Sequence, residues 1–264
     1  MVFKKIYLLV DTINEYPLTF KKAVLLCFFV EGVWFIASLF FHRINLSSGI
    51  MPEIIFLAAV LLTARMMGKD ELRRILAWRD IPLPLFAGIF IMFFGWDIIR
   101  SELRNFFEML LPIPDGFFGD RFHIRNNLFI VILTGALFPG FTEEVFFRGI
   151  IARRFFRTCS PVRAVLLSAV LFGIFHLNPW QAVGAFLGGI FYGWIYYRYK
   201  SIWLCMFSHA YHNILASFSI YPYTRIDNSN YLEWWHHPLW FDILGLLLFG
   251  FGLLTVIVLS RKRE

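Results

Sequence analysis

The chain has 264 residues, of which 59% are hydrophobic, 20% aromatic and only 16% charged. Soluble domains carry about 25% charged residues, so this composition excludes an ordinary soluble domain and is typical of a polytopic membrane protein. The formal net charge is +7, but the basic residues lie between apolar runs instead of forming one basic face, which argues against nucleic-acid binding.

Eight apolar segments are candidates to cross a bilayer as helices. They cover about residues 23–41, 49–67, 83–99, 127–156, 162–176, 180–199, 201–220 and 239–260. An even number of spans puts both termini on one side, and most of the 25 Lys and Arg residues then fall on that side. The positive-inside rule therefore predicts cytoplasmic termini. The predicted fold is an all-α, polytopic membrane helical bundle that forms a single transmembrane domain over residues 1–264.

Two loops are expected on the opposite side of the membrane. Residues 100–125 combine both charge signs with prolines and glycines, which predicts a loop with a short amphipathic helix. Residues 221–237 are polar and aromatic, which fits an interfacial belt. Either loop would shape substrate access or cap the bundle.

Small and polar residues inside the spans indicate close helix packing. Glu31 interrupts the first span and is expected to form an interhelical hydrogen bond. Four glycines of the sixth span are spaced as small-xxx-small pairs, which let helices approach closely in membranes. They are Gly184, Gly188, Gly189 and Gly193.

The fourth span carries two adjacent acids and an arginine, Glu143, Glu144 and Arg148. An ionised side chain at membrane depth costs from about 3 kcal/mol upward, so such groups are rare and usually functional. Glu144 and Arg148 are four residues apart and share a helix face, in the order that favours an ion pair. Glu143 is rotated by about 100° from its neighbour and can point elsewhere. The break at Pro139–Gly140 is expected to kink this helix beside a wet cavity.

Two further spans carry polar couples at helical spacing. Phe172 and His176 are four residues apart in the fifth span, and so are His209 and Asn213 in the seventh. Taken alone, His176 reads as an interfacial or capping residue, and the second couple as hydrogen-bonding glue between helices. Together with the acid pair, these groups need partners inside a bilayer, and the most economical arrangement is that they meet one another.

The order of these motifs is similar to that of the CPBP family, the CAAX-processing and bacteriocin-processing intramembrane proteases that are often labelled abortive-infection or CAAX amino-terminal proteases. Glu-Glu-x-x-x-Arg, Phe-x-x-x-His and His-x-x-x-Asn follow one another on successive hydrophobic helices. The resemblance covers about residues 130–220, which it implies to be the catalytic core. It implies an endopeptidase that hydrolyses a peptide bond within or at the membrane.

The resemblance also assigns roles position by position. It makes Glu143 the general base that activates a water molecule together with His176. It makes His209 and Asn213 the residues that stabilise the oxyanion. Elementary chemistry agrees, because a carboxylate can take a proton from water and return it to the leaving amine. Imidazole and amide donors aimed at a developing oxyanion are effective stabilisers.

By the same resemblance, Glu144 and Arg148 form a supporting ion pair, and Phe172 is a supporting residue. The implied partners are the lipid bilayer and a membrane protein or lipidated peptide as substrate. The short polytopic chain suits a prokaryotic inner membrane. Nothing in the sequence distinguishes a prenylated C-terminus from a bacteriocin leader, a pheromone precursor or a sorting tail.

Two questions stay open at this stage. Glu143, His176 and His209 would make a zinc set with an open water position, but the chain has no His-Glu-x-x-His motif, and a mechanism without a cofactor is preferred. The alternative functions are a transporter or proton relay, because intramembrane acids and histidines also move protons, and a non-catalytic immunity or scaffold protein. Against transport, the polar groups cluster on three helices and no inverted repeat is visible.

Overall fold

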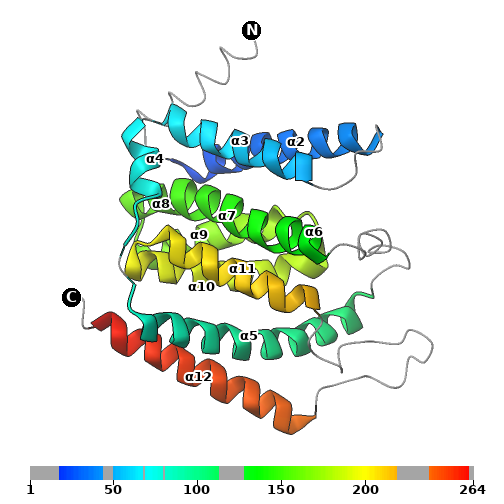
Figure 1. Cartoon of the computed structure of the whole chain (residues 1–264), viewed down its shortest axis with the longest axis vertical. Coiled ribbons are helices and arrows are strands. Elements are labelled where there is room, and N and C mark those ends of the chain that lie inside the picture. Colours follow the sequence, from blue (N-terminus) through cyan, green and yellow to red (C-terminus); the bar gives the residue numbers. More distant parts are fainter. Residues whose placement is uncertain are drawn as a thin grey trace. The chain divides into compact units, whose positions relative to one another are not determined.

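The computed structural model describes residues 18–43, 50–67, 69–79, 81–112, 128–218 and 238–261. Within these ranges every regular element is a helix and no strand occurs, as the composition predicted (Figure 1). The first helices are α2 (Phe20–Arg43), α3 (Ile50–Met66), α4 (Lys69–Ile75) and α5 (Leu83–Leu110). Next come α6 (Leu128–Ile132), η2 (Leu133–Leu137), α7 (Phe138–Glu144), η3 (Val145–Ala152) and α8 (Arg153–Thr158). The last are α9 (Pro161–Ile174), α10 (Pro179–Tyr199), α11 (Ile202–Phe218) and α12 (Leu239–Arg261).

Among the residues that the structure describes, four helical stretches are long and apolar enough to cross a membrane. They are Phe20–Phe41, Leu83–Leu110, Leu128–Thr158 and Leu239–Ser260. The other four predicted spans also fall on helices, namely α3, α9, α10 and α11. A count of eight membrane spans, and the side on which the termini lie, stay predictions. The aromatic loop at 221–237 lies outside the described residues.

The third predicted span is longer than expected. Residues 100–125 were predicted to form a loop with a short amphipathic helix. Residues 100–110 are helical, but they continue α5 to Leu110 instead of forming a separate helix after a loop, so the predicted end of the third span near residue 99 was wrong. The charged residues that suggested a loop instead pair along the helix, where neighbours three and four residues apart face each other. Arg100 lies 2.8 Å from Asp97, and Arg104 lies 3.2 Å from Glu108. Residues 113–125 lie outside the described part.

Contacts divide the chain into two compact units. One contains Met1–Arg79 and Leu137–Phe207, and the other contains Asp80–Ala136 and Ser208–Glu264. The first unit therefore holds α2, α3, α4 and the helices from α7 to α10, while the second holds α5, α6, η2, most of α11, and α12. A single domain over the whole chain stays a prediction.

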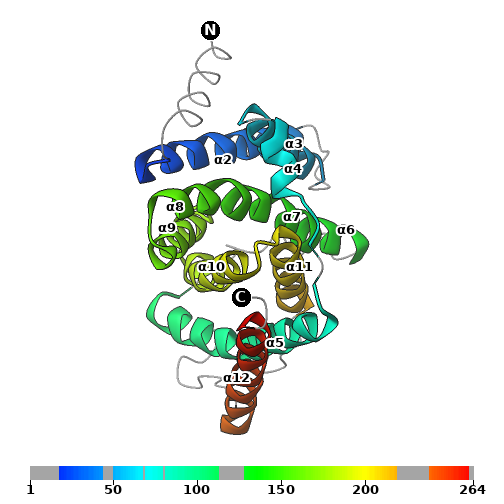
Figure 2. The ribbon, with the colours of Figure 1, turned by 90° about the vertical axis from the view of Figure 1, so that its left-hand side faces the viewer.

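In the first unit, α2 packs beside α3, and α9 beside α10 (Figures 1 and 2). The glycines of α10 permit the second contact. A methyl group on Gly189 would lie 3.1 Å from Ala169, and one on Gly193 would lie 3.1 Å from Val165. Both distances are tighter than ordinary van der Waals contact, so the close packing predicted from these glycines is confirmed for the two positions.

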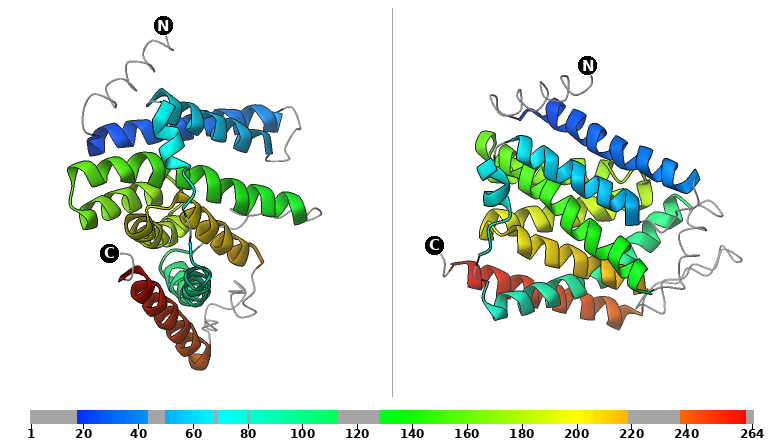
Figure 3. Two further views of the ribbon diagram at one scale, coloured as in Figure 1. Left: turned by 60° about the vertical axis from the view of Figure 1, so that its left-hand side comes forward. Right: turned by 45° about the horizontal axis from the view of Figure 1, so that its top comes forward.

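In the second unit, α5 and α12 cross through glycines on both helices (Figure 3). A methyl group on Gly95 would collide with the backbone of Phe249 and Gly245, and one on Gly252 would collide with the backbone of Met92. Only glycine lets the two backbones approach this closely. Sequence analysis did not single out these glycines.

Candidate active site

The acid pair lies on one continuous helical stretch, Leu128–Thr158. Two π-helical segments flank the α7 turn that carries the acids: η2 ends just before Phe138, and η3 begins at Val145. Pro139 has no backbone N–H, and a wider turn directly before it absorbs the missing hydrogen bond without ending the helix. Single π-helical turns occur frequently at functional sites. No pattern in the sequence indicated them.

The predicted pairing of Glu144 with Arg148 is confirmed. Arg148 Nη1 donates to Glu144 Oε1 at 2.9 Å, and both side chains are fully buried, with 0% exposure. Arg148 Nη2 donates to the carbonyl oxygen of Gly189 on α10 at 3.1 Å. The guanidinium also lies over the rings of Phe172 and Tyr192, at 4.4 and 5.1 Å from their centroids. The planar cation is thus held on several sides, which lysine could not reproduce.

Glu143 is half-buried on α7 and lies within electrostatic range of two acids from other helices. These are Glu31 on α2 and Glu53 on α3. Trp34 Nε1 donates to Glu53 Oε1 at 3.0 Å, so this bond joins α2 to α3. An interhelical hydrogen bond was expected from Glu31. The bond that joins the two helices is instead made by Trp34 and Glu53. The signal for Glu53 was present as an acid inside a predicted span.

His176 lies on the short turn between α9 and α10. Its Nδ1 is 2.7 Å from the carbonyl oxygen of Phe172, and the two rings meet edge to face at 4.9 Å. Because a carbonyl oxygen only accepts, Nδ1 carries the proton, and Nε2 is the acceptor nitrogen of the neutral ring. Leu177 follows with a left-handed φ of 50°, a conformation that is sparsely populated outside glycine and often found at functional sites.

The alternative reading of His176 as a capping residue is confirmed at the C-terminal end of α9, because its Nδ1 bonds the carbonyl oxygen of Phe172 in the last turn of that helix. It does not cap α10. Asn178 is the N-cap of that helix, since its side-chain oxygen accepts from the backbone N–H groups of Trp180 and Gln181. The first unit therefore brings the first two motifs together through one ring: Phe172 contacts the Arg148 guanidinium and the His176 imidazole.

The third motif lies on α11, in the second unit. His209 is buried, and Asn213 is half-buried one turn further along the helix. Their predicted convergence with Glu143 and His176 stays a prediction.

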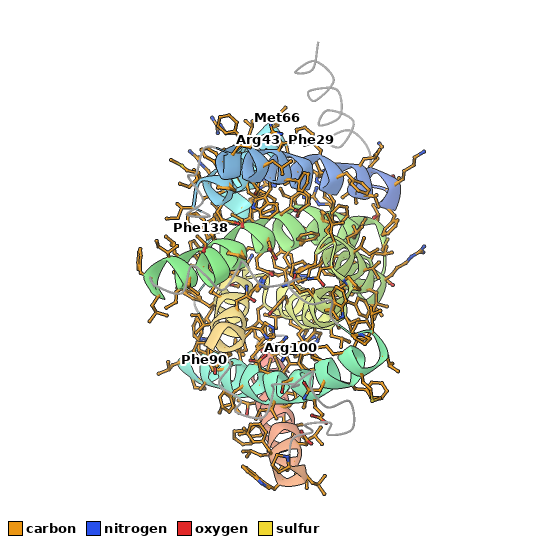
Figure 4. The ribbon with its side chains drawn as sticks, turned by 90° about the vertical axis from the view of Figure 1, so that its right-hand side faces the viewer. Phe29, Arg43, Met66, Phe90, Arg100 and Phe138 are labelled. Carbon is orange, nitrogen blue, oxygen red and sulfur yellow. The ribbon has the colours of Figure 1, made fainter. Side chains whose placement is uncertain are left out.

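Sequence analysis missed one buried acid. Asp97 of α5 has 0% side-chain exposure, and Arg100 approaches it through Nε at 2.9 Å and Nη2 at 2.8 Å. His212 of α11 lies 3.5 Å from the same carboxylate oxygen. Figure 4 marks Phe90 and Arg100 along α5, which carries this acid. The available signal was an acid in the middle of an apolar span, the same signal that singled out Glu143.

A metal set was also tested against the geometry. Among the residues that the structure describes, no group of three or more His, Cys, Asp or Glu side chains could hold a metal ion. Zinc chemistry therefore gains no support from the arrangement of side chains, and a mechanism without a cofactor stays a prediction.

Comparison with known families adds the deciding observation. Residues 125–215 match the model of the family described as Rce1-like, type II CAAX prenyl endopeptidase Rce1-like. This segment is similar to the Rce1-like family. It spans all three motifs, and the resemblance to the CPBP intramembrane proteases is confirmed. Searches of curated proteins and of solved structures gave no match. The four membrane-length helices found in the described part of the chain support an integral membrane protein.

Proposed function

We propose that the chain is an intramembrane endopeptidase that hydrolyses a peptide bond of a membrane-associated protein or lipidated peptide. The observation that carries the proposal is the Rce1-like match, because residues 125–215 contain every motif residue from Glu143 to Asn213. The family description names a prenyl endopeptidase, so a prenylated peptide is the first substrate to test.

In the proposed first step, the Glu143 carboxylate takes one proton from a water molecule. The Nε2 atom of His176 accepts a hydrogen bond from the second water hydrogen, a role supported by the contact of Nδ1 with the carbonyl of Phe172. The water oxygen then bonds to the carbonyl carbon of the substrate, and the carbonyl oxygen becomes an oxyanion. General-base catalysis of this kind contributes about 10²–10⁴-fold to the rate.

In the second step, His209 and Asn213 donate hydrogen bonds to that oxyanion. A donor placed in this way is worth about 3–4 kcal/mol of transition-state stabilisation. The bond between carbon and nitrogen then breaks, and Glu143 gives its proton to the departing nitrogen. The products are a carboxylic acid and an amine, which exchange a proton to give a carboxylate and an ammonium group, and every step uses side chains of the chain itself.

The supporting pair keeps its charges out of this chemistry. The two terminal nitrogens of Arg148 donate to Glu144 and to the carbonyl of Gly189. We therefore give the arginine no direct part in the reaction. Glu143 is thereby left to exchange its proton with water. We further propose eight membrane spans, on the eight apolar segments, and cytoplasmic termini, on the distribution of Lys and Arg. The short polytopic chain suits residence in a prokaryotic inner membrane.

The test is Glu143→Gln, which keeps the size and polarity of the side chain but removes the base. Wild type and variant are purified at full length, returned to proteoliposomes and given a fluorogenic farnesylated peptide ending in a CAAX sequence. Because the base is lost, turnover should fall by about 100-fold or more. Membrane peptides from cells that express either form, compared by mass spectrometry, extend the test to unknown substrates.

The matched control is Glu108→Gln, the same change on α5, where Glu108 pairs with Arg104 at 3.2 Å. This variant should keep wild-type turnover. Near-normal cleavage by Glu143→Gln would refute the assignment of the base. Ion-coupled uptake into proteoliposomes, without cleavage of any membrane peptide, would favour a transporter instead.

A further inference from the structure

A buried acid that the proposed mechanism does not use lies on α5, in the second unit. Three groups lie close to the Oδ1 atom of Asp97. Arg100 Nη2 lies at 2.8 Å and Arg100 Nε donates to it at 2.9 Å, while His212 Nδ1 approaches to 3.5 Å without forming a hydrogen bond. Asp97 is fully enclosed, whereas the Arg100 and His212 side chains are 19% and 12% exposed. Asp97 is therefore the most deeply buried of these three side chains.

Adhesion between α5 and α11 does not require this acid. Aromatic contacts already join the helices: the Phe90 and Tyr211 rings meet at 4.7 Å, and the Phe93 and His212 rings at 6.2 Å. Well-packed apolar residues usually replace a buried ion pair without loss of stability, and sometimes with a gain. A charged pair kept inside a membrane-length helix thus indicates a role in orientation rather than in packing.

What the acid orients is the side of α11 that carries the third motif. His212 follows His209 by three residues and precedes Asn213 by one, so His209 lies on the neighbouring turn of the same face. The two histidine rings lie near enough to interact electrostatically. Because a helix turns as a rigid unit, a fixed direction for the His212 ring fixes the rotation of α11 about its axis.

We propose that Asp97 is a positioning residue: with its charge balanced by Arg100, it faces the Nδ1 side of His212 and so biases the rotation at which α11 presents His209 and Asn213. The inference rests on the proposed function of these two residues as oxyanion donors. Asp97 itself touches no reacting atom. Residues that orient catalytic groups from behind typically change activity by about 10–100-fold when they are replaced.

The main test is Asp97→Asn, assayed in proteoliposomes with the fluorogenic farnesylated peptide. We expect kcat to fall about tenfold or more, with KM within about twofold of wild type. His212→Gln should give the same loss, and it leaves the Asp97–Arg100 pair intact if the first variant fails to fold. The double variant should be no worse than either single one, because both remove the same contact. Independent, additive losses would overturn the proposal.

The matched control is Ser101→Ala, a buried polar residue one turn along α5 whose hydroxyl donates to the carbonyl of Ile98 at 2.8 Å. It should keep wild-type kcat. A second readout needs no substrate: the ring ¹⁵N signals of histidine-labelled protein in nanodiscs. Asp97→Asn should shift the signals of His212 and His209, and Ser101→Ala should not. Unchanged histidine signals in Asp97→Asn would overturn the proposal.

The two proposals fail in different ways. If wild type cleaves, Glu143→Gln does not, and Asp97→Asn equals wild type, only the positioning role falls. If Glu143→Gln cleaves as fast as wild type, the proposed function falls and the positioning role falls with it.

Discussion

Two buried carboxylate–arginine pairs, one in each unit, differ in how completely they are enclosed. Glu144 and Arg148 are both at 0% exposure, and the arginine is further held by the Gly189 carbonyl and two aromatic rings. Asp97 is also at 0%, but Arg100 keeps 19% of its side chain exposed. The first cation is thus closed on several sides, while the second reaches the edge of its unit.

The difference separates two uses of the same chemistry. In a fully enclosed pair, each charge must be balanced by its partner, because neither water nor another residue can replace a missing partner. Glu144 and Arg148 therefore tie the motif helix to α10. The pair at Asp97 has a histidine at 3.5 Å from its shared oxygen, so it can act on a third group. One pair fastens helices, and the other directs a side chain.

The largest effect is expected from Arg148→Met, which would leave Glu144 buried and uncompensated. Loss of one partner of a buried pair costs about 3–5 kcal/mol. We expect a large drop in thermal stability in detergent micelles, measured by tryptophan fluorescence. The double variant Glu144→Gln/Arg148→Met removes both charges and should regain part of that stability. A double variant less stable than Arg148→Met would contradict the view that the two charges of the enclosed pair mainly balance each other.

A smaller effect is expected from Arg100→Met. Because part of this side chain is exposed, water can partly replace the lost partner of Asp97, and the cost should be about 1–3 kcal/mol. The same thermal unfolding experiment measures it. A loss equal to that of Arg148→Met would remove the distinction between the two pairs.

The smallest effect, none at all, is expected from metal removal. In the comparison, arginine supplies the positive charge beside both acids, and the proposed hydrolysis needs no ion. Dialysis against a chelator should therefore leave the melting temperature and the cleavage rate unchanged, and elemental analysis should find no stoichiometric zinc. Zinc that is lost together with activity would give Glu143 and His176 a different role.

Much of the fold and part of the candidate site could be predicted from local pattern. Apolar runs of bilayer length predicted helices, and helices occur at each of those places in the described part of the chain. The spacing of Glu144 and Arg148 predicted their ion pair, because residues four apart on a helix must share a face. These inferences needed only the period of the helix and the cost of charge in lipid.

Other features lay beyond local pattern. The charged residues after Arg100 suggested a loop. Their ion pairs, such as Arg104 with Glu108, form only because the helix continues through them. The requirement for glycine at a position such as Gly95 becomes apparent only when α12 packs against it. The π-helical turns beside Glu143 were likewise not indicated by the spacing of apolar residues.

By itself, the sequence determined the helical membrane class, the positions of the helices and the three motifs that resemble an intramembrane protease. These follow from hydropathy and from spacing along one helix, which are local properties. Only the tertiary structure decided that Phe172 joins Arg148 to His176, and that Asp97 faces His212. The spacing of Phe172 and His176 was visible in the sequence, but the contacts of Phe172 with Arg148 and of Asp97 with His212 join residues on different helices. Their identity depends on which helix faces pack together, which no spacing within one helix encodes.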